Sequence, residues 1–238
     1  MYDLDIILPC YNPHEGWTDE LLTQFAALQM SLSGVRIHLI IVNDGSTQVI
    51  DKQHFIKIKQ QHLTTTFVEY ATNRGKGNAV REGLKHTQSP FQLYTDIDFP
   101  FQKEAMIAAY KALQEGVDVV IGNRKTSYET QLRPYRKMLS IGSHWFNKYL
   151  LGLPYIDTQG GMKAFNALGR KEMLDTRIDR YLFDTEFVMR CSQHPSIKIQ
   201  EVPIETREGI YLSEMGFAVL RKEFGNIMRL LRVRMGLK

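Results

Sequence analysis

Short apolar runs separated by longer amphipathic stretches fill the first half of the chain, at the spacing of buried strands that alternate with helices. Five apolar runs predict strands at Asp5–Pro9, His38–Val42, Thr66–Tyr70, Phe91–Thr95 and Val117–Ile121. The stretches between them predict helices at Trp17–Leu32, Val49–Gln61, Lys76–His86 and Lys103–Glu115. This alternation predicts an α/β fold with a mostly parallel sheet and helices on both of its faces.

After Ile121 the rhythm of strand and helix breaks. The pattern there predicts a long helix at Tyr135–Leu151, a turn-rich piece at Gly152–Gly161, a helix at Phe183–Ser192 and a strand at Ile197–Val202. No repeat, low-complexity tract or linker interrupts the sequence. We therefore expect residues 1–212 to form one domain, in which residues 125–212 complete the fold begun by residues 1–124.

A basic amphipathic helix is predicted within residues 213–238. Apolar residues recur there at steps of three and four: Phe217, Leu220, Phe224, Ile227, Met228, Leu231 and Met235. From Arg221 to the end, six basic residues stand against one acid, whereas the whole chain carries a net charge of +4. Two interpretations stay open, because the helix could lie on anionic lipid or dock on the protein with a solvated basic face.

Composition favours an ordinary globular protein of the reducing cytoplasm, peripheral at the inner face of a membrane if the basic helix binds lipid. The 238 residues are 43% hydrophobic, enough for one large core. The two cysteines, Cys10 and Cys191, lie far apart and lack metal-ligand spacing. The acidic start at residues 1–5 is unlike a signal peptide, and no run approaches the ~20 apolar residues that span a bilayer. Nucleic-acid binding is disfavoured, because the basic residues gather in one tail helix without a reading motif.

Polar loops follow the first two predicted strands. Tyr11 follows the first and Asp44 follows the second, so parallel strands would bring both to the carboxyl edge of the sheet, where open α/β sheets bind ligands. The carboxylate of Asp44 could accept a hydrogen bond from the ring N–H of uracil or guanine, and Tyr11 could stack on that base. The alternative is an ordinary turn and helix cap, which use the same residue types.

Two carboxylates, Asp96 and Asp98, follow the fourth predicted strand. Acids this close repel each other unless a cation lies between them, so they predict a metal ion that bridges diphosphate oxygens. The alternative is a helix cap with a neighbouring acid before Pro100. After the third strand, the glycines of residues 73–79 permit close backbone approach and Lys76 could meet a phosphate, although this loop is neither a P-loop nor GxGxxG.

The chain resembles the family 2 glycosyltransferases, and the resemblance is closest to the dolichyl-phosphate mannosyl- and glucosyltransferase branch. It covers about the first 205 residues and rests on the order of the motifs, because no single motif would suffice. In chain order these are Pro9–Asn12, Val42–Thr47, Asn73–Gly77, Asp96–Asp98, Gly122–Arg124, Asp157–Phe165 and Tyr181–Glu186.

This resemblance implies the GT-A fold, a UDP- or GDP-linked sugar donor bound by residues 1–124, Mg²⁺ or Mn²⁺, and inversion at the anomeric carbon. Carried over by position, the residues that would hold the nucleoside are Pro9, Tyr11 and Asp44. The residues that would engage the metal and the donor sugar are Asp96 and Asp98, and those that would face the phosphates are Arg124 and Arg133. The residues that would lie near the reacting sugar are Gln159 and Asp157.

The resemblance also implies that residues 125–212 bind the acceptor. The oxygen of a polyprenyl phosphate is already anionic and needs no strong base, and the basic residues that could bind this phosphate are Arg133, Arg136 and Lys137. A hydroxyl acceptor would instead need a general base within hydrogen-bond reach. The candidates for that base are Asp157, Asp184 and Glu186, of which Glu186 is also a predicted acceptor contact.

Three departures from the family pattern narrow these expectations. Pro13 stands where some relatives have Glu, and Pro100 stands where several bacterial relatives have a Gln that Pro cannot replace as a metal ligand. The absence of a QxxRW signature favours transfer of a single sugar over polymerisation. The alternatives are a non-catalytic nucleotide-binding module, which the intact Asp96 and Asp98 disfavour, and a sugar nucleotidylyltransferase, which would carry a glycine-rich loop after the first strand.

Overall fold

The computed structural model describes residues 1–48, 50–61, 64–124, 145–154, 157–207 and 217–235. Its strands are β1 (Leu4–Cys10), β2 (Ile37–Asp44), β3 (Thr65–Tyr70), β4 (Phe91–Tyr94), β5 (Val119–Arg124), β6 (Lys163–Phe165) and β7 (Ile199–Ile204). Its helices are α1 (Trp17–Ser31), α2 (Lys52–Gln60), α3 (Lys76–Leu84), α4 (Lys103–Gln114), α6 (Ala167–Leu174), α7 (Phe183–Gln193) and α8 (Phe217–Arg234), with a π-helical turn at Phe146–Leu150.

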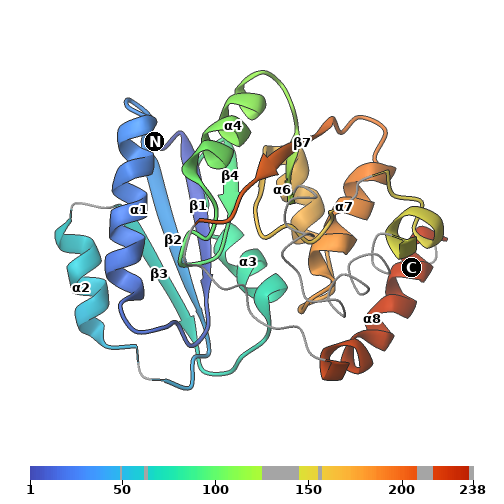
Figure 1. The fold of residues 1–238 in the computed structure, drawn as a ribbon, viewed down its shortest axis with the longest axis horizontal. Coiled ribbons are helices and arrows are strands. Elements are labelled where there is room, and N and C mark those ends of the chain that lie inside the picture. The colour runs from blue at the N-terminus through green and yellow to red at the C-terminus, as the bar shows by residue number, and fades with distance from the viewer. Residues whose placement is uncertain (49, 62–63, 125–144, 155–156, 208–216, 236–238) are drawn as a thin grey trace.

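One seven-stranded sheet runs through the molecule in the order β3-β2-β1-β4-β6-β5-β7 (Figure 1). β1 pairs in parallel with both β2 and β4, β2 with β3, and β5 with β7. β6 is antiparallel to its two neighbours, β4 and β5, so β4 and β5 point the same way. The mostly parallel sheet predicted from the sequence is therefore confirmed, with one reversed strand, β6, in its interior.

Helices cover both faces of the sheet, as predicted. On one face, apolar side chains of α1 and α4, such as Leu21 and Met106, are buried in the same cluster as Ile6 and Leu8 of β1. Alternate residues of β1 therefore face these two helices. On the other face, α3, α6 and α7 pack over Ile7 and its neighbours. This two-sided burial is the reason the strands read as continuous apolar runs.

The five strands and four helices predicted in the first half are present, with ends shifted by up to three residues. The predicted helix Phe183–Ser192 and strand Ile197–Val202 correspond to α7 and β7. Two elements were missed, β6 and α6, and α6 begins where the Asn166 side chain caps the backbone N–H of Leu168. Most of the predicted helix at 135–151 lies outside the described residues.

The C-terminal helix α8 is present and is docked at the α7 side of the molecule (Figure 1). Leu230 is completely buried in the same core cluster as Phe187, whereas Met228 and Met235 are 44% and 63% exposed. The helix packs on the core through Leu230, with the partly buried Leu231 of the predicted apolar face beside it, and leaves Met228 and Met235 of that face exposed. In the part of the chain that the structure describes, no helix is both long and apolar enough to cross a membrane.

Candidate active site

Several predicted site residues lie at one edge of the sheet. β1, β2, β4 and β5 point the same way, so the segments that follow them share the carboxyl edge. β6 runs in the opposite direction, which brings the segment before it, residues 157–162, to that same edge. The loops that carry Tyr11, Asp44, Asp96, Arg124 and Gln159 are therefore neighbours because of the strand directions alone.

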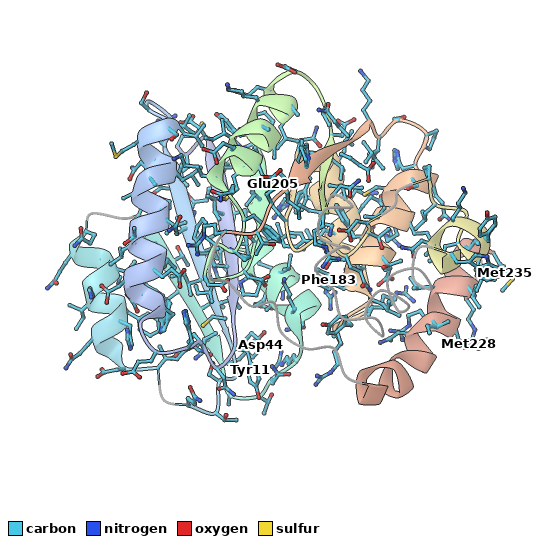
Figure 2. All side chains as sticks on the ribbon, in the orientation of Figure 1. Tyr11, Asp44, Phe183, Glu205, Met228 and Met235 are labelled. Atoms are coloured by element: carbon cyan, nitrogen blue, oxygen red, sulfur yellow. The ribbon has the colours of Figure 1, made fainter. Side chains whose placement is uncertain are left out.

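The loops after β1 and β2 are joined by hydrogen bonds around Asn12. The backbone N–H of Asn12 donates to the Ser46 hydroxyl at 2.9 Å. The side-chain Oδ1 of Asn12 accepts a hydrogen bond from the backbone N–H of Thr47, also at 2.9 Å. Asn12 has a φ of 44°, a left-handed conformation that Asn tolerates better than most residues. Beside it, the Tyr11 side chain is 48% exposed, in keeping with the predicted stacking on a base (Figure 2).

Pro9 and Asp44 are both buried. Pro9 lies within β1 opposite Val42, below the exposed Tyr11. The carboxylate of Asp44 accepts four hydrogen bonds, and their donors are the Tyr70 hydroxyl, the Asn73 side-chain amide and the backbone N–H groups of Arg74 and Gly75. A carboxylate offers about four lone-pair positions, so these donors occupy Asp44 completely. Its observed contacts hold the loop after β3, and its predicted contact with a base stays a prediction.

The glycine-bearing loop after β3 packs against the protein itself. A side chain at Gly75 would overlap the carbonyl oxygen of Asp179, and one at Gly77 would lie 2.7 Å from that of Ile178. The backbone N–H of Gly77 donates to the Asp179 carbonyl at 2.8 Å. The close backbone approach predicted from these glycines is real, but the partner is the segment before α7.

Lys76 and Asp96 form an ion pair at the carboxyl edge of the sheet. Their Nζ and Oδ1 atoms are 2.5 Å apart, and the side chains are 31% and 39% exposed. Burial alone would lower the pKa of Lys76, but the charges of Asp96 and Asp184 hold that pKa above its usual value. Lys76 is therefore charged at neutral pH and places a cation beside the predicted metal ligands.

Asp98 lies close to Asp96 and is half-buried. Burial, and then the charge of Asp96, raise the pKa of Asp98 above its usual value. The following residue, Phe99, has a φ of 46° with its side chain buried, a conformation that costs a non-glycine residue on the order of 1–3 kcal/mol. The turn that presents Asp98 is thus strained and must be held by its surroundings.

These two carboxylates suit a hard divalent cation. Carboxylate oxygens are the ligands that Mg²⁺ and Mn²⁺ prefer, and the Lys76 ammonium shows that the position attracts positive charge. Among the described residues, no cluster of three or more His, Cys, Asp or Glu side chains could hold a metal. Asp96 and Asp98 could supply two ligands to such a cation, and its remaining positions would then fall to water or to a bound diphosphate.

Arg124 and Asp157 form a bidentate ion pair at the same edge. Arg124 Nε is 2.7 Å from Asp157 Oδ2, and its Nη2 is 2.9 Å from Oδ1. Although burial favours the neutral acid, hydrogen bonds and charge from Arg124 hold the pKa of Asp157 below its usual value. The backbone N–H of the half-buried Gln159 also donates to Asp157, at 3.2 Å. Asp157 thus organises this segment as an ionised acceptor.

The other two candidate bases are also occupied. Asp184 accepts a hydrogen bond from the Tyr94 hydroxyl and lies 3.1 Å from the ammonium of Lys163, which is completely buried in β6. Glu186 is 1% exposed, and its Oε2 accepts the backbone N–H groups of Arg177 and Ile178 at 2.9 and 2.7 Å.

The predicted acceptor contact of Glu186 stays a prediction, and the buried carboxylate already caps two backbone N–H groups through Oε2. The other predicted acceptor contact, Arg133, lies outside the described residues, as do Arg136 and Lys137.

Two contributors to the site were missed in the sequence. Gly161 is the first, because a Cβ there would lie 3.1 Å from Asp96 Oδ2, so this glycine makes room for the carboxylate. Arg207 is the second, because its guanidinium donates to the backbone carbonyls of Asp98 and Phe99. The paired glycines after Gln159 were a signal for the first, whereas nothing around Arg207 in the sequence indicated the second.

A doubly wound sheet with acidic residues at the end of a central strand is the architecture of the GT-A glycosyltransferases. Two solved structures of that class share the fold: glucosyl-3-phosphoglycerate synthase from Mycobacterium tuberculosis, solved with Mn²⁺, UDP-glucose and phosphoglyceric acid (TM-score 0.63, 16% identity, 100% of this chain and 81% of that one), and mannosyl-3-phosphoglycerate synthase from Rubrobacter xylanophilus (TM-score 0.68, 14% identity, 98% and 74%).

The family follows from the sequence match. Residues 5–177 match the model of glycosyl transferase family 2, and the chain belongs to this family. It lies near the dolichyl-phosphate sugar transferases: it is 28% identical over 238 aligned residues to the dolichyl-phosphate beta-glucosyltransferase of Saccharomyces cerevisiae, across 91% of this chain and 70% of the yeast protein. The protein is therefore a glycosyltransferase.

Proposed function

We propose that this chain transfers one hexose, with inversion, from a UDP- or GDP-linked sugar to a polyprenyl phosphate, with the help of Mg²⁺ or Mn²⁺. The observation that favours this acceptor is that all three candidate bases are already bonded to partners within the protein. Asp157 is paired with Arg124, Asp184 with Tyr94 and Lys163, and Glu186 with two backbone N–H groups. An acceptor that is already anionic needs none of them, whereas a hydroxyl acceptor would.

The donor would lie along the carboxyl edge of the sheet. Tyr11 offers an exposed ring for the base, and Asp96 and Asp98 would hold the metal, which when bound neutralises charge on the diphosphate. Lys76 adds a fixed positive charge at the same place, close to where the leaving group gains negative charge.

In the reaction, a phosphate oxygen of the acceptor forms a bond to the anomeric carbon while the bond from that carbon to the diphosphate breaks. The electron pair leaves with the nucleoside diphosphate. The positive charges of Lys76 and Arg124, the latter paired with Asp157, would lie next to the negative charge that this leaving group gains. Asp157 stays ionised throughout and fixes the orientation of Arg124, with Gln159 held beside it through its backbone.

Residues on and near α8 support contact with an anionic membrane surface. Met228 and Met235, labelled in Figure 2, are exposed on α8. Trp145, just before the π-helical turn, and Tyr149, within it, are each 61% exposed and their rings are in contact. A groove of about 410 Å³ there is lined by Leu150, Met228, Leu231, Arg232, Arg234 and Met235. Exposed apolar and aromatic side chains beside arginines suit the interface of anionic lipid. This contact would bring the carboxyl edge within reach of a lipid-linked acceptor.

The test is sugar transfer to a short polyprenyl phosphate from UDP-glucose, UDP-galactose, UDP-N-acetylglucosamine and GDP-mannose with Mn²⁺, comparing the native chain with Asp98→Ala. We expect sugar on the lipid from one donor, lost in the variant. Metal-dependent donor hydrolysis without transfer would point to a hydroxyl acceptor, and no turnover with any donor would favour a nucleotide-binding module.

Membrane contact is tested separately by flotation with vesicles containing phosphatidylserine. We expect Met228→Glu together with Met235→Glu to reduce the bound fraction, while Met30→Glu, at an exposed methionine of α1, leaves it unchanged. Equal binding of all three proteins would exclude this surface.

A further inference from the structure

The turn that presents Asp98 is held from outside by one arginine. The guanidinium of Arg207 donates from Nε to the Phe99 carbonyl and from Nη2 to the Asp98 carbonyl, each at 2.6 Å. Its backbone N–H donates to the Pro100 carbonyl at 2.9 Å. Three successive carbonyls of the strained turn are therefore bound by a single residue.

Arg207 is itself fixed from a third element. Its Nη2 is 2.5 Å from Glu20 Oε1 on α1, and the two side chains are only 15% and 28% exposed. The backbone before Arg207 is paired as well, because the backbone N–H of Gln102 donates to the carbonyl of Glu205, labelled in Figure 2, at 2.9 Å. The segment after β7 thus ties α1 to the turn between β4 and α4.

We propose that Arg207 is a positioning residue for the metal site: it fixes the backbone of residues 98–100 so that the Asp98 carboxylate faces the metal. This inference rests on the proposed function, in which Asp98 is a metal ligand. Phe99 has a φ of 46°, so the turn would relax toward an ordinary conformation if its carbonyls lost these donors, and the carboxylate one residue earlier would turn with it.

The planar guanidinium is what the position requires. It reaches two adjacent carbonyls and a carboxylate at once through a rigid fork of donors, whereas a lysine ammonium is a point charge on a flexible stem. A lysine at position 207 should therefore keep part of the positioning effect. A methionine, which keeps most of the apolar stem, should keep none of it.

The experiment measures binding of Mn²⁺ alone by the electron paramagnetic resonance signal of the free ion, with thermal unfolding of each variant recorded beside it. We expect Arg207→Met to weaken Mn²⁺ binding by about tenfold, as loss of a group that orients a metal ligand does, and Arg207→Lys to be intermediate. Glu20→Gln, which keeps the arginine but removes its counter-charge, should weaken binding in the same direction by a smaller factor.

The matched control is Arg170→Met. Arg170 also donates from its guanidinium to a backbone carbonyl, that of Leu84 at 2.9 Å, but at the end of α3 that leads into β4, away from the carboxyl edge. We expect this variant to lose stability and to bind Mn²⁺ as the native chain does. The catalysed reaction should also distinguish Arg207→Met from this control. The Arg207 variant should need more Mn²⁺ for half-maximal rate, and Arg170→Met should not.

Native Mn²⁺ affinity in both Arg207→Met and Glu20→Gln would overturn the positioning role and leave the proposed function intact. If Arg207→Met does not fold, the Glu20→Gln result decides alone. A native chain that binds no Mn²⁺, or that binds it equally well after Asp98→Ala, would instead overturn the metal site itself and this inference with it.

Discussion

Lys76 and Asp96 are 20 residues apart in the sequence, yet their charged atoms lie 2.5 Å apart at the carboxyl edge of the sheet. The register of β1 with β4 and the parallel direction of β3 bring the loops that follow β3 and β4 to the same edge. The ammonium is positive at neutral pH, so it compensates part of the repulsion between Asp96 and Asp98. A metal and this lysine would therefore compete for one carboxylate.

This competition predicts two opposite effects of Lys76→Met. Mn²⁺ alone should bind tighter by about threefold, the size expected when a half-exposed ion pair no longer has to be broken. The donor in the presence of Mn²⁺ should bind more weakly, because the diphosphate loses a positive partner. Calorimetry with Mn²⁺, and then with the nucleotide added, measures both quantities.

Lys85→Met is the control for that experiment, because Lys85 pairs with Glu82 at 2.7 Å on the exposed side of α3. Its removal should change neither affinity. If Lys76→Met bound Mn²⁺ more weakly than the native chain, the ammonium would be supporting the metal site rather than competing for it.

The Arg124–Asp157 pair predicts a pH-dependent loss of stability in Asp157→Asn. The pKa of Asp157 is lower in the folded state than in the unfolded chain, so the pair stabilises the fold above the unfolded pKa and this contribution disappears as pH falls through the folded pKa. Above pH ~5 the variant should be less stable by about 2 kcal/mol, because the buried bonds of the carboxylate are lost. The difference from the native chain should shrink below pH ~4.

Urea unfolding at several pH values between 3 and 7 tests this. Asp3→Asn is an exposed reference: Arg36 hydrogen bonds lower the pKa of Asp3 to about 2, and solvent screens that pair. We expect a smaller change from it at every pH. A stability difference for Asp157→Asn that persists undiminished at pH 3 would show that its charge is not the source.

Glu186→Gln should act on stability and leave the acceptor untouched. The glutamate carboxylate caps the backbone N–H groups of Arg177 and Ile178 while 1% exposed, and replacing it weakens charge-assisted bonds at a cost of about 1–2 kcal/mol. Thermal unfolding should show the loss, and the KM for the polyprenyl phosphate should stay within about twofold. Glu115→Gln, at the exposed end of α4, should change neither. A raised KM without a stability change would return Glu186 to the acceptor site.

The sequence predicted those elements whose signal is local. The apolar runs of β1 to β5 and the acids that follow β4 are visible in any one stretch of the chain, because burial on both faces demands continuous apolar residues. β6 was missed because it has three residues and includes Lys163, whose charge breaks the apolar pattern. Only the folded chain brings Asp184 within 3.1 Å to compensate that charge.

The roles of individual loops depended on contacts that sequence spacing does not contain. The glycines at 75 and 77 correctly indicated a close approach, but the approaching group is the carbonyl of a segment a hundred residues later. Along α8, the protein buries Leu230 and partly buries Leu231, whereas Met228 and Met235 of the predicted face stay exposed, because the neighbouring core and not the helix's own periodicity decides which side chains are covered. Arg207 became part of the site only when β7 placed it beside Phe99.

Gly161 gives the most local test of the metal site. No positive φ constrains this glycine, so alanine fits its backbone. The added methyl would lie 3.1 Å from Asp96 Oδ2 and 3.3 Å from the Phe101 ring, which forces the carboxylate or the ring to shift by a few tenths of an ångström. Because metal ligands tolerate displacements of only about 0.2 Å, we expect Gly161→Ala to weaken Mn²⁺ binding with little change in the thermal unfolding temperature.

Two other glycines bracket that outcome. At Gly225, in α8, nothing lies within 4 Å of an added Cβ, so Gly225→Ala should stabilise the helix by roughly 0.5–1 kcal/mol and leave Mn²⁺ binding unchanged. At Gly160 the Cβ would overlap the Gly122 carbonyl, so Gly160→Ala should destabilise the whole fold. A Gly161→Ala protein that unfolds like Gly160→Ala would reveal a packing role, and one that binds Mn²⁺ normally would show that the added methyl displaces no metal ligand. Weakened binding in a stable protein is the result that supports Asp96 as a ligand.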